Sequence, residues 1–305
     1  MSGDDRIRWV LADGAVGQAL APLRPGESGR RGYATVCANG EKLFVKAFRE
    51  RGLEGMIRQR LAQRGRAEFD LGRRLIQRGV PTPEPLGYGI AKRHSFVVQR
   101  HLDGQSLLEA LNDEERRPAL FQALARFLNL LKEAGVRHND LHLDNILLAH
   151  DGLYLIDLHS ARIERKFNEG DELSNLSHAL AMHYRTMTDA EKEGFFEAYG
   201  SQRLRRDLEN RITEMEERWV ASKAKRALAA TSEISVRGAY VCLGDESPAE
   251  TPTPGTILKK DRKVVVERFG TYVAKTYSSR RRLLRAWRAH VILHYMGLSV
   301  TPRAY

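Results

Sequence analysis

Polar residues in the middle of the chain have the types and the spacing that phosphoryl transfer requires. His138 and Asp140 stand two residues apart, Asn145 follows five residues later, and Asp157 ends an apolar run. Phosphoryl transfer depends mostly on positioning and on charge neutralisation. In such a reaction Asp140 would orient the attacking hydroxyl and accept its proton. Asn145 and Asp157 would supply the oxygen ligands that Mg²⁺ prefers, against the phosphates of a nucleotide.

A lysine and a glutamate nearer the N-terminus complete this set. Lys46 lies in a strand-like stretch, from which it would reach the nucleotide phosphates as a point charge. Glu68 lies on the helical stretch that follows and would hold Lys46 in place. Glu54 and Asp70 are also near, so the choice of Glu68 depends on counting back along the helix from Gly79.

The histidines around these acids suggest a zinc site only weakly. His138 and His142 stand four residues apart, but the sequence has no glutamate between them and no third ligand nearby. We therefore expect His138 to be a structural residue of the loop. His159, two residues after Asp157, is expected to pack or to form a hydrogen bond.

The surrounding sequence predicts the elements that must position these residues. Asn39-Gly40 is a strong turn signal between two strand-like runs, so a hairpin is expected there. Gly79 and Gly135 end two helical patterns, and the prolines at 81, 83 and 85 require an extended segment. The expected elements are a hairpin of 33–38 and 42–48, a helix from about 53 to 77, a strand at 95–99, a helix at 118–134, a strand at 153–159 and mostly helical sequence from 173 to about 231.

At these residues the chain resembles the protein-kinase-like superfamily. The spacing of His138, Asp140 and Asn145, followed by Asp157, matches the kinase catalytic loop and its metal-binding aspartate. Within that superfamily, the Asp-Leu-His sequence at 157–159, in place of Asp-Phe-Gly, resembles the lipopolysaccharide core kinases of the Kdo/heptose type.

The resemblance extends over about residues 43–231 and includes the Gly-Val-Pro-Thr-Pro-Glu-Pro segment at 79–85. It implies an α+β fold of the protein-kinase-like, bilobal type. The small β-rich N-lobe would occupy about 1–100, and the larger helical C-lobe about 101–231. The loop at 26–32 departs from the superfamily pattern because it lacks a clean Gly-x-Gly-x-x-Gly.

The resemblance also implies ATP as the phosphoryl donor, Mg²⁺ as the metal, and a role for each matching residue. The implied roles are catalytic base for Asp140, magnesium ligation for Asn145 and Asp157, binding of the ATP phosphates for Lys46, pairing with that lysine for Glu68, and a hinge beside the adenine for 99–102, which includes Gln99 and His101.

An internal repeat connects the two ends of the chain. The strand-like run at 43–48 resembles 272–277, and in both copies a basic helix, a glycine and a Thr-Pro pair follow. The pattern predicts a strand at 272–277 and a helix at 280–295. After a linker at 232–255, residues 256–305 would then be the start of a second, truncated kinase-like N-lobe, which makes the chain a partial tandem repeat.

The second copy lacks parts that catalysis needs. Lys275 matches Lys46, but Ala286 stands where Glu68 would be, and no His-x-Asp follows. We therefore expect no catalysis by this segment. The alternative is a C-terminal extension that packs on the first domain.

Composition and charge restrict the setting of the protein. The chain has 305 residues, of which 42% are hydrophobic and 29% are charged, as in globular proteins. Cys37 and Cys242 lie far apart and cannot form a disulfide framework, and no run approaches the roughly 20 apolar residues that span a bilayer. We expect a cytoplasmic protein. Its net charge of +11 attracts nucleotides, anionic lipid, nucleic acid or phosphorylated glycans without choosing among them.

These observations favour an ATP- and Mg²⁺-dependent kinase that phosphorylates a hydroxyl of a lipopolysaccharide core sugar, Kdo or heptose. Such an acceptor allows a peripheral contact with the cytoplasmic face of the inner membrane. The alternatives are another small-molecule kinase, a protein kinase, or a kinase-like scaffold that only binds partners. Nucleic-acid binding is supported by charge alone, because no recognisable motif is present, and is not expected.

Overall fold

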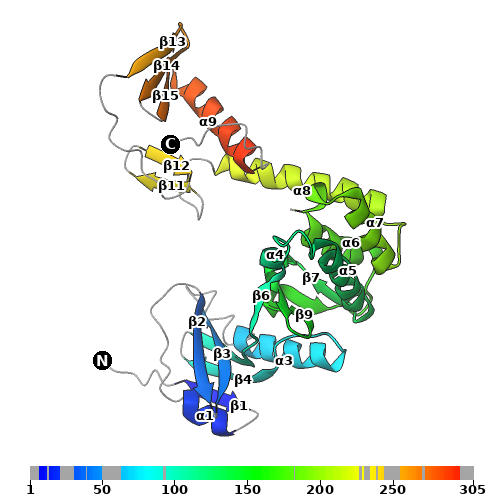
Figure 1. Cartoon of the computed structure of the whole chain (residues 1–305). Coiled ribbons are helices and arrows are strands. Elements are labelled where there is room, and N and C mark those ends of the chain that lie inside the picture. The colour runs from blue at the N-terminus through cyan, green and yellow to red at the C-terminus, as the bar shows by residue number, and fades with distance from the viewer. Residues whose placement is uncertain are drawn as a thin grey trace, which may run out of the picture. The chain divides into compact units, whose positions relative to one another are not determined.

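The computed structural model of the chain consists of two compact units, residues 1–212 and 213–305 (Figure 1). All the predicted site residues lie in the first unit. The residues that the structure describes are 7–11, 14–20, 31–38, 40–49, 63–91, 94–181, 183–226, 229, 234–237, 240–243, 255–269 and 272–295.

A five-stranded antiparallel sheet forms the N-terminal part of the first unit, with its strands in the order β1-β4-β5-β3-β2. The predicted hairpin is present: β2 pairs with β3, and Gly40 in the turn has a φ of 81°. Most of the glycine-containing loop at 26–32 lies outside the described residues. The bounds are β1 Arg8–Leu11, α1 Gly14–Leu20, β2 Arg31–Ala38, β3 Glu41–Arg49, β4 Pro85–Ala91 and β5 His94–Arg100.

Helix α3, Arg64–Gln77, packs against β4 and β5 (Figure 1). A glycine permits this close approach, because a Cβ atom at Gly65 would stand 2.2 Å from the carbonyl oxygen of Phe96. The Gly65 N–H also donates a hydrogen bond to Ser95 Oγ at 3.1 Å. Gly79 follows the end of the helix, as predicted, with a φ of 77°. The predicted start near 53 lies outside the described residues.

The rest of the first unit is mainly helical and surrounds one apolar core. The predicted helix at 118–134 is present as α5, and Gly135 ends it. The strand predicted at 153–159 is shorter, because β9 ends at Leu155 and Asp157 adopts a left-handed conformation that a strand does not allow. The helices are α4 Leu107–Ala110, α5 Arg117–Glu133, α6 Glu169–Leu180, α7 Asp189–Tyr199 and α8 Arg205–Lys225, of which α8 begins in the first unit and extends past residue 212 into the second. The strands are β6 Gly104–Ser106, β7 Val136–His138, β8 Ile146–Ala149, β9 Gly152–Leu155 and β10 Ala161–Ile163, and the 3-10 turns are η1 Leu143–Asn145, η2 Leu158–Ser160 and η3 Tyr184–Thr186.

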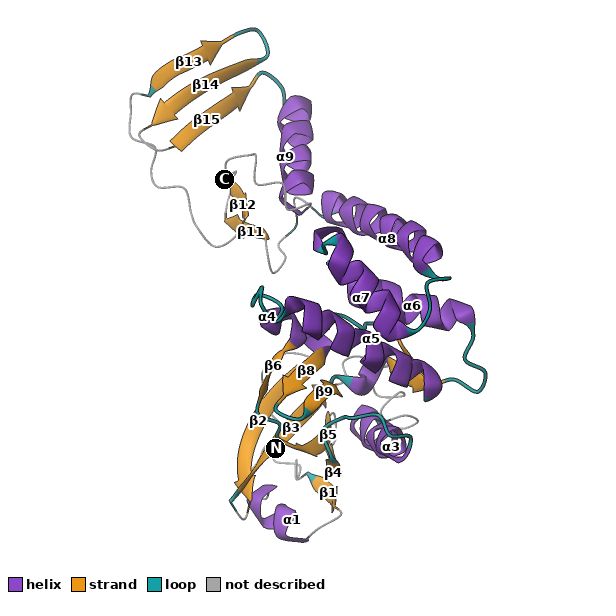
Figure 2. Cartoon of the chain, turned by 45° about the vertical axis from the view of Figure 1, so that its right-hand side comes forward, coloured by secondary structure: helices purple, strands orange, loops and turns teal. Residues whose placement is uncertain are grey.

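The second unit contains a hairpin, a three-stranded antiparallel sheet and helix α9 (Figure 2). The predicted strand at 272–277 and helix at 280–295 are both confirmed, as β15 Tyr272–Tyr277 and α9 Arg280–Tyr295. Strands β13 Thr256–Lys260 and β14 Val264–Phe269 complete the sheet. The identity of this unit as a second kinase-like lobe stays a prediction.

The segment predicted as a linker, 232–255, is partly structured. It contains the hairpin of β11, Ile234–Arg237, and β12, Tyr240–Leu243. The β-branched and aromatic residues of these two short runs favour strands, and the prolines that indicated a linker all follow β12.

Candidate active site

A buried lysine connects the N-terminal sheet, helix α3 and the segment after β9. Lys46 on β3 and Glu68 on α3 are each only 3% exposed. The Lys46 Nζ atom lies 2.9 Å from Oε1 and 3.0 Å from Oε2 of Glu68. The same Nζ donates a hydrogen bond to the carboxylate of Asp157. The carboxylates of Glu68 and Asp157 therefore both contact the ammonium group of Lys46, although Asp157 lies 111 positions after it in the sequence.

The charges of this cluster favour a cationic ligand. Burial raises the pKa of Glu68, and the charge of Lys46 opposes that rise. Burial would also raise the pKa of Asp157, but the hydrogen bonds and charges of Lys46 and His159 outweigh it and lower the pKa. One lysine thus faces two carboxylates. When both are ionised, a bound divalent cation would offset the excess negative charge.

Asp157 has an unusual backbone conformation that its neighbours hold in place. With φ 55° and ψ 59° it is the one non-glycine residue with positive φ among those that the structure describes. Its carbonyl oxygen lies 3.2 Å from His138 Nε2, and its Oδ1 lies 2.7 Å from His159 Nδ1. Such a conformation costs on the order of 1 kcal/mol and is common at functional sites. The turn directs the carboxylate of Asp157 back toward Lys46.

His138 joins the two predicted catalytic segments through one neutral tautomer. The backbone N–H of Asp140 donates to His138 Nδ1 at 3.2 Å, so Nδ1 is unprotonated and Nε2 carries the hydrogen that is donated to the Asp157 carbonyl. Burial lowers the pKa of His138 to about 4. The ring is therefore neutral at physiological pH and positions the loop, in line with the structural role expected from the sequence.

Asn145 also holds the backbone of the loop that carries Asp140. Its Nδ2 donates to the carbonyl oxygen of Asp140 at 2.8 Å and lies 3.0 Å from His142 Nε2. Its Oδ1 therefore remains as an oxygen ligand for a cation. The backbone N–H of Ile156 donates to the Asn145 carbonyl at 2.9 Å, which ties η1 to the residue before Asp157. Asn145 and Asp157 are thus held on adjacent strand ends.

Among the predicted catalytic and metal-binding residues, Asp140 has the carboxylate that is exposed to solvent. Its side chain is 57% exposed, and within the described part of the chain it accepts no hydrogen bond; the nearest ionisable partner is His142 Nε2 at 3.8 Å. A carboxylate with free lone pairs on a rigid loop is available to an incoming hydroxyl.

The donor set fits magnesium better than zinc. Within the described ranges, no three His, Cys, Asp or Glu side chains converge into a metal-binding group. Structural zinc needs such a group, whereas Mg²⁺ is usually held by one or two protein oxygens together with substrate phosphates and water. Asn145 and Asp157 match that second pattern.

The predicted hinge is bound to its neighbours on both sides. Gln99 is buried on β5 and pairs with β3. The N–H of Arg100 donates to the Glu84 carbonyl at 2.9 Å, and the N–H of His101 donates to the Lys42 carbonyl at 3.0 Å. These bonds hold 99–102 in the fixed connection between the sheet and the helical part that a hinge requires.

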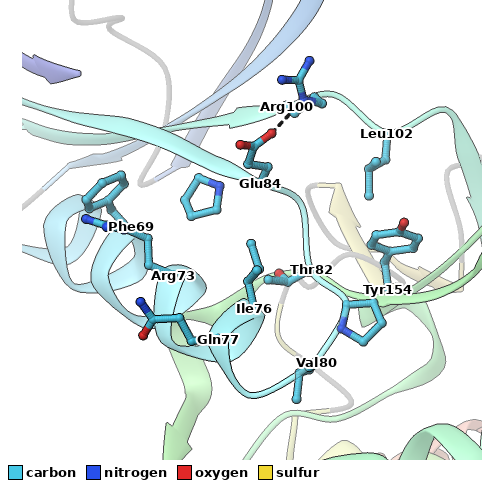
Figure 3. Close-up of a pocket in the computed structure, with 13 residues that line it drawn as sticks. Phe69, Arg73, Ile76, Gln77, Val80, Thr82, Glu84, Arg100, Leu102 and Tyr154 are labelled. Carbon is cyan, nitrogen blue, oxygen red and sulfur yellow. Dashed lines mark hydrogen bonds and ion pairs between the residues drawn. The ribbon is translucent and has the colours of Figure 1, made fainter. Parts of the chain in front are cut away.

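A pocket of about 770 Å³ lies beside this hinge (Figure 3). Phe69, Arg73 and Ile76 of α3 form one wall, and Leu102 and Tyr154 contribute from the hinge and from β9. The dashed contact in Figure 3 is the ion pair of Glu84 with Arg100, at 2.9 Å. Of the predicted site residues, Lys46, Glu68, Asp140, Asn145 and Asp157 do not line it, so it is separate from the candidate active site.

Two residues that support the site were not found from the sequence. Asn175 on α6 is buried; its Oδ1 accepts from the His138 N–H at 3.0 Å, and its Nδ2 donates to the Val136 carbonyl at 2.7 Å. Thr82 Oγ1 donates to the Leu155 carbonyl at 2.8 Å, just before Asp157. Asn175 has no local sequence pattern that separates it from an ordinary helical Asn, whereas Thr82 belongs to the segment at 79–85 that the resemblance includes, without a role assigned to it.

Comparisons with known proteins identify the family of this chain. Residues 21–199 match the model of the lipopolysaccharide kinase (Kdo/WaaP) family. The chain is 32% identical over 160 residues to a lipopolysaccharide core heptose(I) kinase, WaaP, of Pseudomonas aeruginosa. The matched region covers 44% of this chain and 59% of that protein. The chain is 31% identical over 144 residues to a 3-deoxy-D-manno-octulosonic acid kinase of Xylella fastidiosa, covering 43% of this chain and 57% of the relative. The chain thus matches less than two thirds of the length of either relative.

A solved structure of WaaP in complex with acyl carrier protein is similar to 70% of this chain and to 98% of that chain, with a TM-score of 0.51 and 25% sequence identity.

Proposed function

The chain belongs to the Kdo/WaaP family of lipopolysaccharide kinases, and from that premise we propose that it transfers the γ-phosphoryl group of ATP to a hydroxyl of a lipopolysaccharide core sugar, Kdo or heptose. Its fold is the α+β, kinase-like fold of that family. The observation that carries the proposal is the meeting of Lys46, Glu68 and Asp157, with His138 connecting Asp157 to the loop of Asp140.

In this proposal the open carboxylate of Asp140 is the general base. It accepts the proton of the acceptor hydroxyl as the new bond from oxygen to the γ-phosphorus forms and the bond to the ADP oxygen breaks. The exposure of Asp140 and its rigid backbone contacts with His138 and Asn145 support this role. The nearby His138 ring is neutral, so it does not pair with this carboxylate as a cation.

Lys46, Asn145 and Asp157 would hold the donor. Lys46 binds the phosphates, and Glu68 keeps its ammonium group in place. Asn145 Oδ1 and the carboxylate of Asp157 would hold Mg²⁺, which when bound neutralises charge on the phosphates. The hinge, with Gln99 and His101, lies beside the adenine in this proposal, as the resemblance to kinases implies, and its backbone is fixed to β3 and to the segment before β4.

The acceptor is the finer part of the proposal. The names of the two relatives, a heptose kinase and a 3-deoxy-D-manno-octulosonic acid kinase, support a core sugar and leave both sugars open. No helix among the described residues is long and apolar enough to cross a bilayer. In this proposal a membrane-bound acceptor is reached by peripheral contact from the cytoplasmic side.

A nucleotide-turnover assay with Mg²⁺ across core oligosaccharides, simple sugars and peptides tests the proposal. We expect ADP release and a phosphorylated product with a Kdo- or heptose-containing core oligosaccharide only. Turnover with peptides or aminoglycosides instead would favour another kinase of the superfamily. Nucleotide binding without turnover on any acceptor would favour a scaffold.

A further inference from the structure

Most of the net positive charge of this protein belongs to one short segment of the second unit. Residues 256–295, which we call the basic module, contain eleven Lys and Arg and two Asp and Glu, a net charge of +9 out of +11 for the whole chain. All eleven basic side chains are exposed: Lys259, Lys260, Arg262, Lys263, Arg268, Lys275, Arg280, Arg281, Arg282, Arg285 and Arg288. Among the described residues, Lys259 of this set pairs with Asp261 at 3.3 Å.

The basic module also exposes aliphatic side chains. Ile257 is 55% exposed, Leu258 53%, Val273 49% and Leu283 48%. Seven large hydrophobic residues are at least 43% exposed in the part of the chain that the structure describes, and four of them lie in these forty residues. Aliphatic side chains and cations therefore share the exposed surface of the basic module.

Helix α9 has a less exposed apolar face and an exposed face that carries its arginines together with Leu283. Leu284, Trp287 and Val291 lie on its less exposed face, and its arginines point outward. Arg280, Arg281 and Arg282 occupy the first turn, where the helix dipole favours acids and disfavours cations. Their placement therefore weakens the isolated helix and is explained by an anionic partner.

We propose that the basic module docks on an anionic lipid bilayer. Anionic headgroups complement its charge, and the exposed aliphatic side chains can enter the boundary between headgroups and acyl chains. Nucleic acid fits less well, because single-stranded binding surfaces stack bases on aromatic rings and the exposed apolar residues of the basic module are aliphatic. The choice of a membrane rests on the proposed function because that function places the acceptor at a membrane. The charge distribution of the basic module does not depend on the proposed function.

Vesicle flotation with the full chain tests this surface. The probe is a vesicle of phosphatidylethanolamine and phosphatidylglycerol in a three-to-one ratio, compared with a vesicle of phosphatidylcholine alone. We expect binding to the first vesicle only, weakened by salt. Each basic residue near an anionic surface contributes about fivefold to partitioning, so Arg280→Gln, Arg281→Gln and Arg282→Gln together should lower it by roughly 100-fold.

The first unit supplies a matched control. Arg66, Arg73 and Arg74 are three exposed arginines on α3, and replacing them with Gln removes the same charge from another part of the chain. This control should partition like the wild-type chain. If it loses as much binding as the α9 variant, net charge alone explains the binding and the basic module is not the docking surface.

Two further variants guard against misfolding of α9. Lys260→Gln, Arg262→Gln and Lys263→Gln, around the turn between β13 and β14, should lower partitioning by a similar factor. Ile257→Ser with Leu258→Ser should lower it by roughly tenfold while leaving its salt dependence unchanged.

Three results would overturn the proposal: equal binding to both vesicles or to neither, a polynucleotide that binds more tightly and displaces the vesicles, or a dimer in solution that covers the basic module. Failure of the kinase proposal is separate, because Asp140→Asn should float with vesicles as the wild-type chain does whether or not the chain transfers phosphate.

Discussion

The buried His138 ring should make the stability of the protein depend on pH in a way that one substitution removes. Its pKa is about 4 in the folded chain, against an ordinary value of 6.5. Between these values the unfolded chain binds a proton on this ring and the folded chain does not. Protonation of His138 therefore favours the unfolded chain. The free energy of unfolding is highest above pH 6.5 and decreases as the pH falls toward 4.

The size of the effect follows from the two pKa values. Going from about pH 7.5 to about pH 5, the difference in proton binding lowers the free energy of unfolding by about 2 kcal/mol. His138→Gln keeps an acceptor and a donor near Asp140 and Asp157 but cannot be protonated. We expect its unfolding free energy to fall by about 2 kcal/mol less than that of the wild-type chain over the same interval.

Urea unfolding followed by far-ultraviolet circular dichroism at the two pH values measures this difference. His150→Gln is a suitable control, because the His150 side chain is 94% exposed and its removal should leave the pH dependence unchanged. Nuclear magnetic resonance of the imidazole nitrogens gives a direct check. A His138 ring that titrates near 6.5, or that carries its hydrogen on Nδ1, would refute the reasoning.

Three more predictions concern the site and the second unit. Asp157→Ala should weaken ATP binding more in the presence of Mg²⁺ than in its absence, as measured by calorimetry, because Asp157 is a proposed metal ligand; equal losses in both conditions would indicate a structural role. The KM for an anionic core acceptor should rise with salt while turnover at saturating acceptor changes less, since salt screens the basic surface; a KM that does not respond to salt would favour a neutral acceptor. Deletion of residues 256–305 should leave the Kd for ATP unchanged, because every proposed site residue precedes position 160; loss of folding or of ATP binding would show that this segment is integral to the first unit.

The elements that the sequence predicts correctly are those with local signals. The Asn-Gly pair predicts the turn between β2 and β3, and Gly135 predicts the end of α5. The alternation at 272–277 and the helical spacing at 280–295 predict β15 and α9 with their bounds. The contact of Glu68 with Lys46 follows from counting along a helix whose end a glycine marks.

What the sequence does not predict depends on contacts between distant segments. Asn175 meets His138 only because α6 packs beside β7, 37 positions away. The tautomer of His138 is set by the backbone at 140 and 157, and the left-handed turn at Asp157 is stabilised by those same contacts. The hairpin of β11 and β12 was missed for another reason, since the three prolines that follow it, at 248, 252 and 254, indicate a linker for the whole segment.

Transfer of phosphate from ATP labelled at the γ-position to a Kdo- or heptose-containing core oligosaccharide, compared between the wild-type chain and Asp140→Asn in a single turnover, tests the central claim most directly. The substitution keeps the shape of the side chain and the backbone contacts with His138 and Asn145, so ATP should bind with an unchanged Kd. Without a base, the transfer rate should fall by about 100-fold or more. A variant that binds ATP and transfers phosphate at the wild-type rate would contradict the assignment of Asp140, and with it the proposed active site.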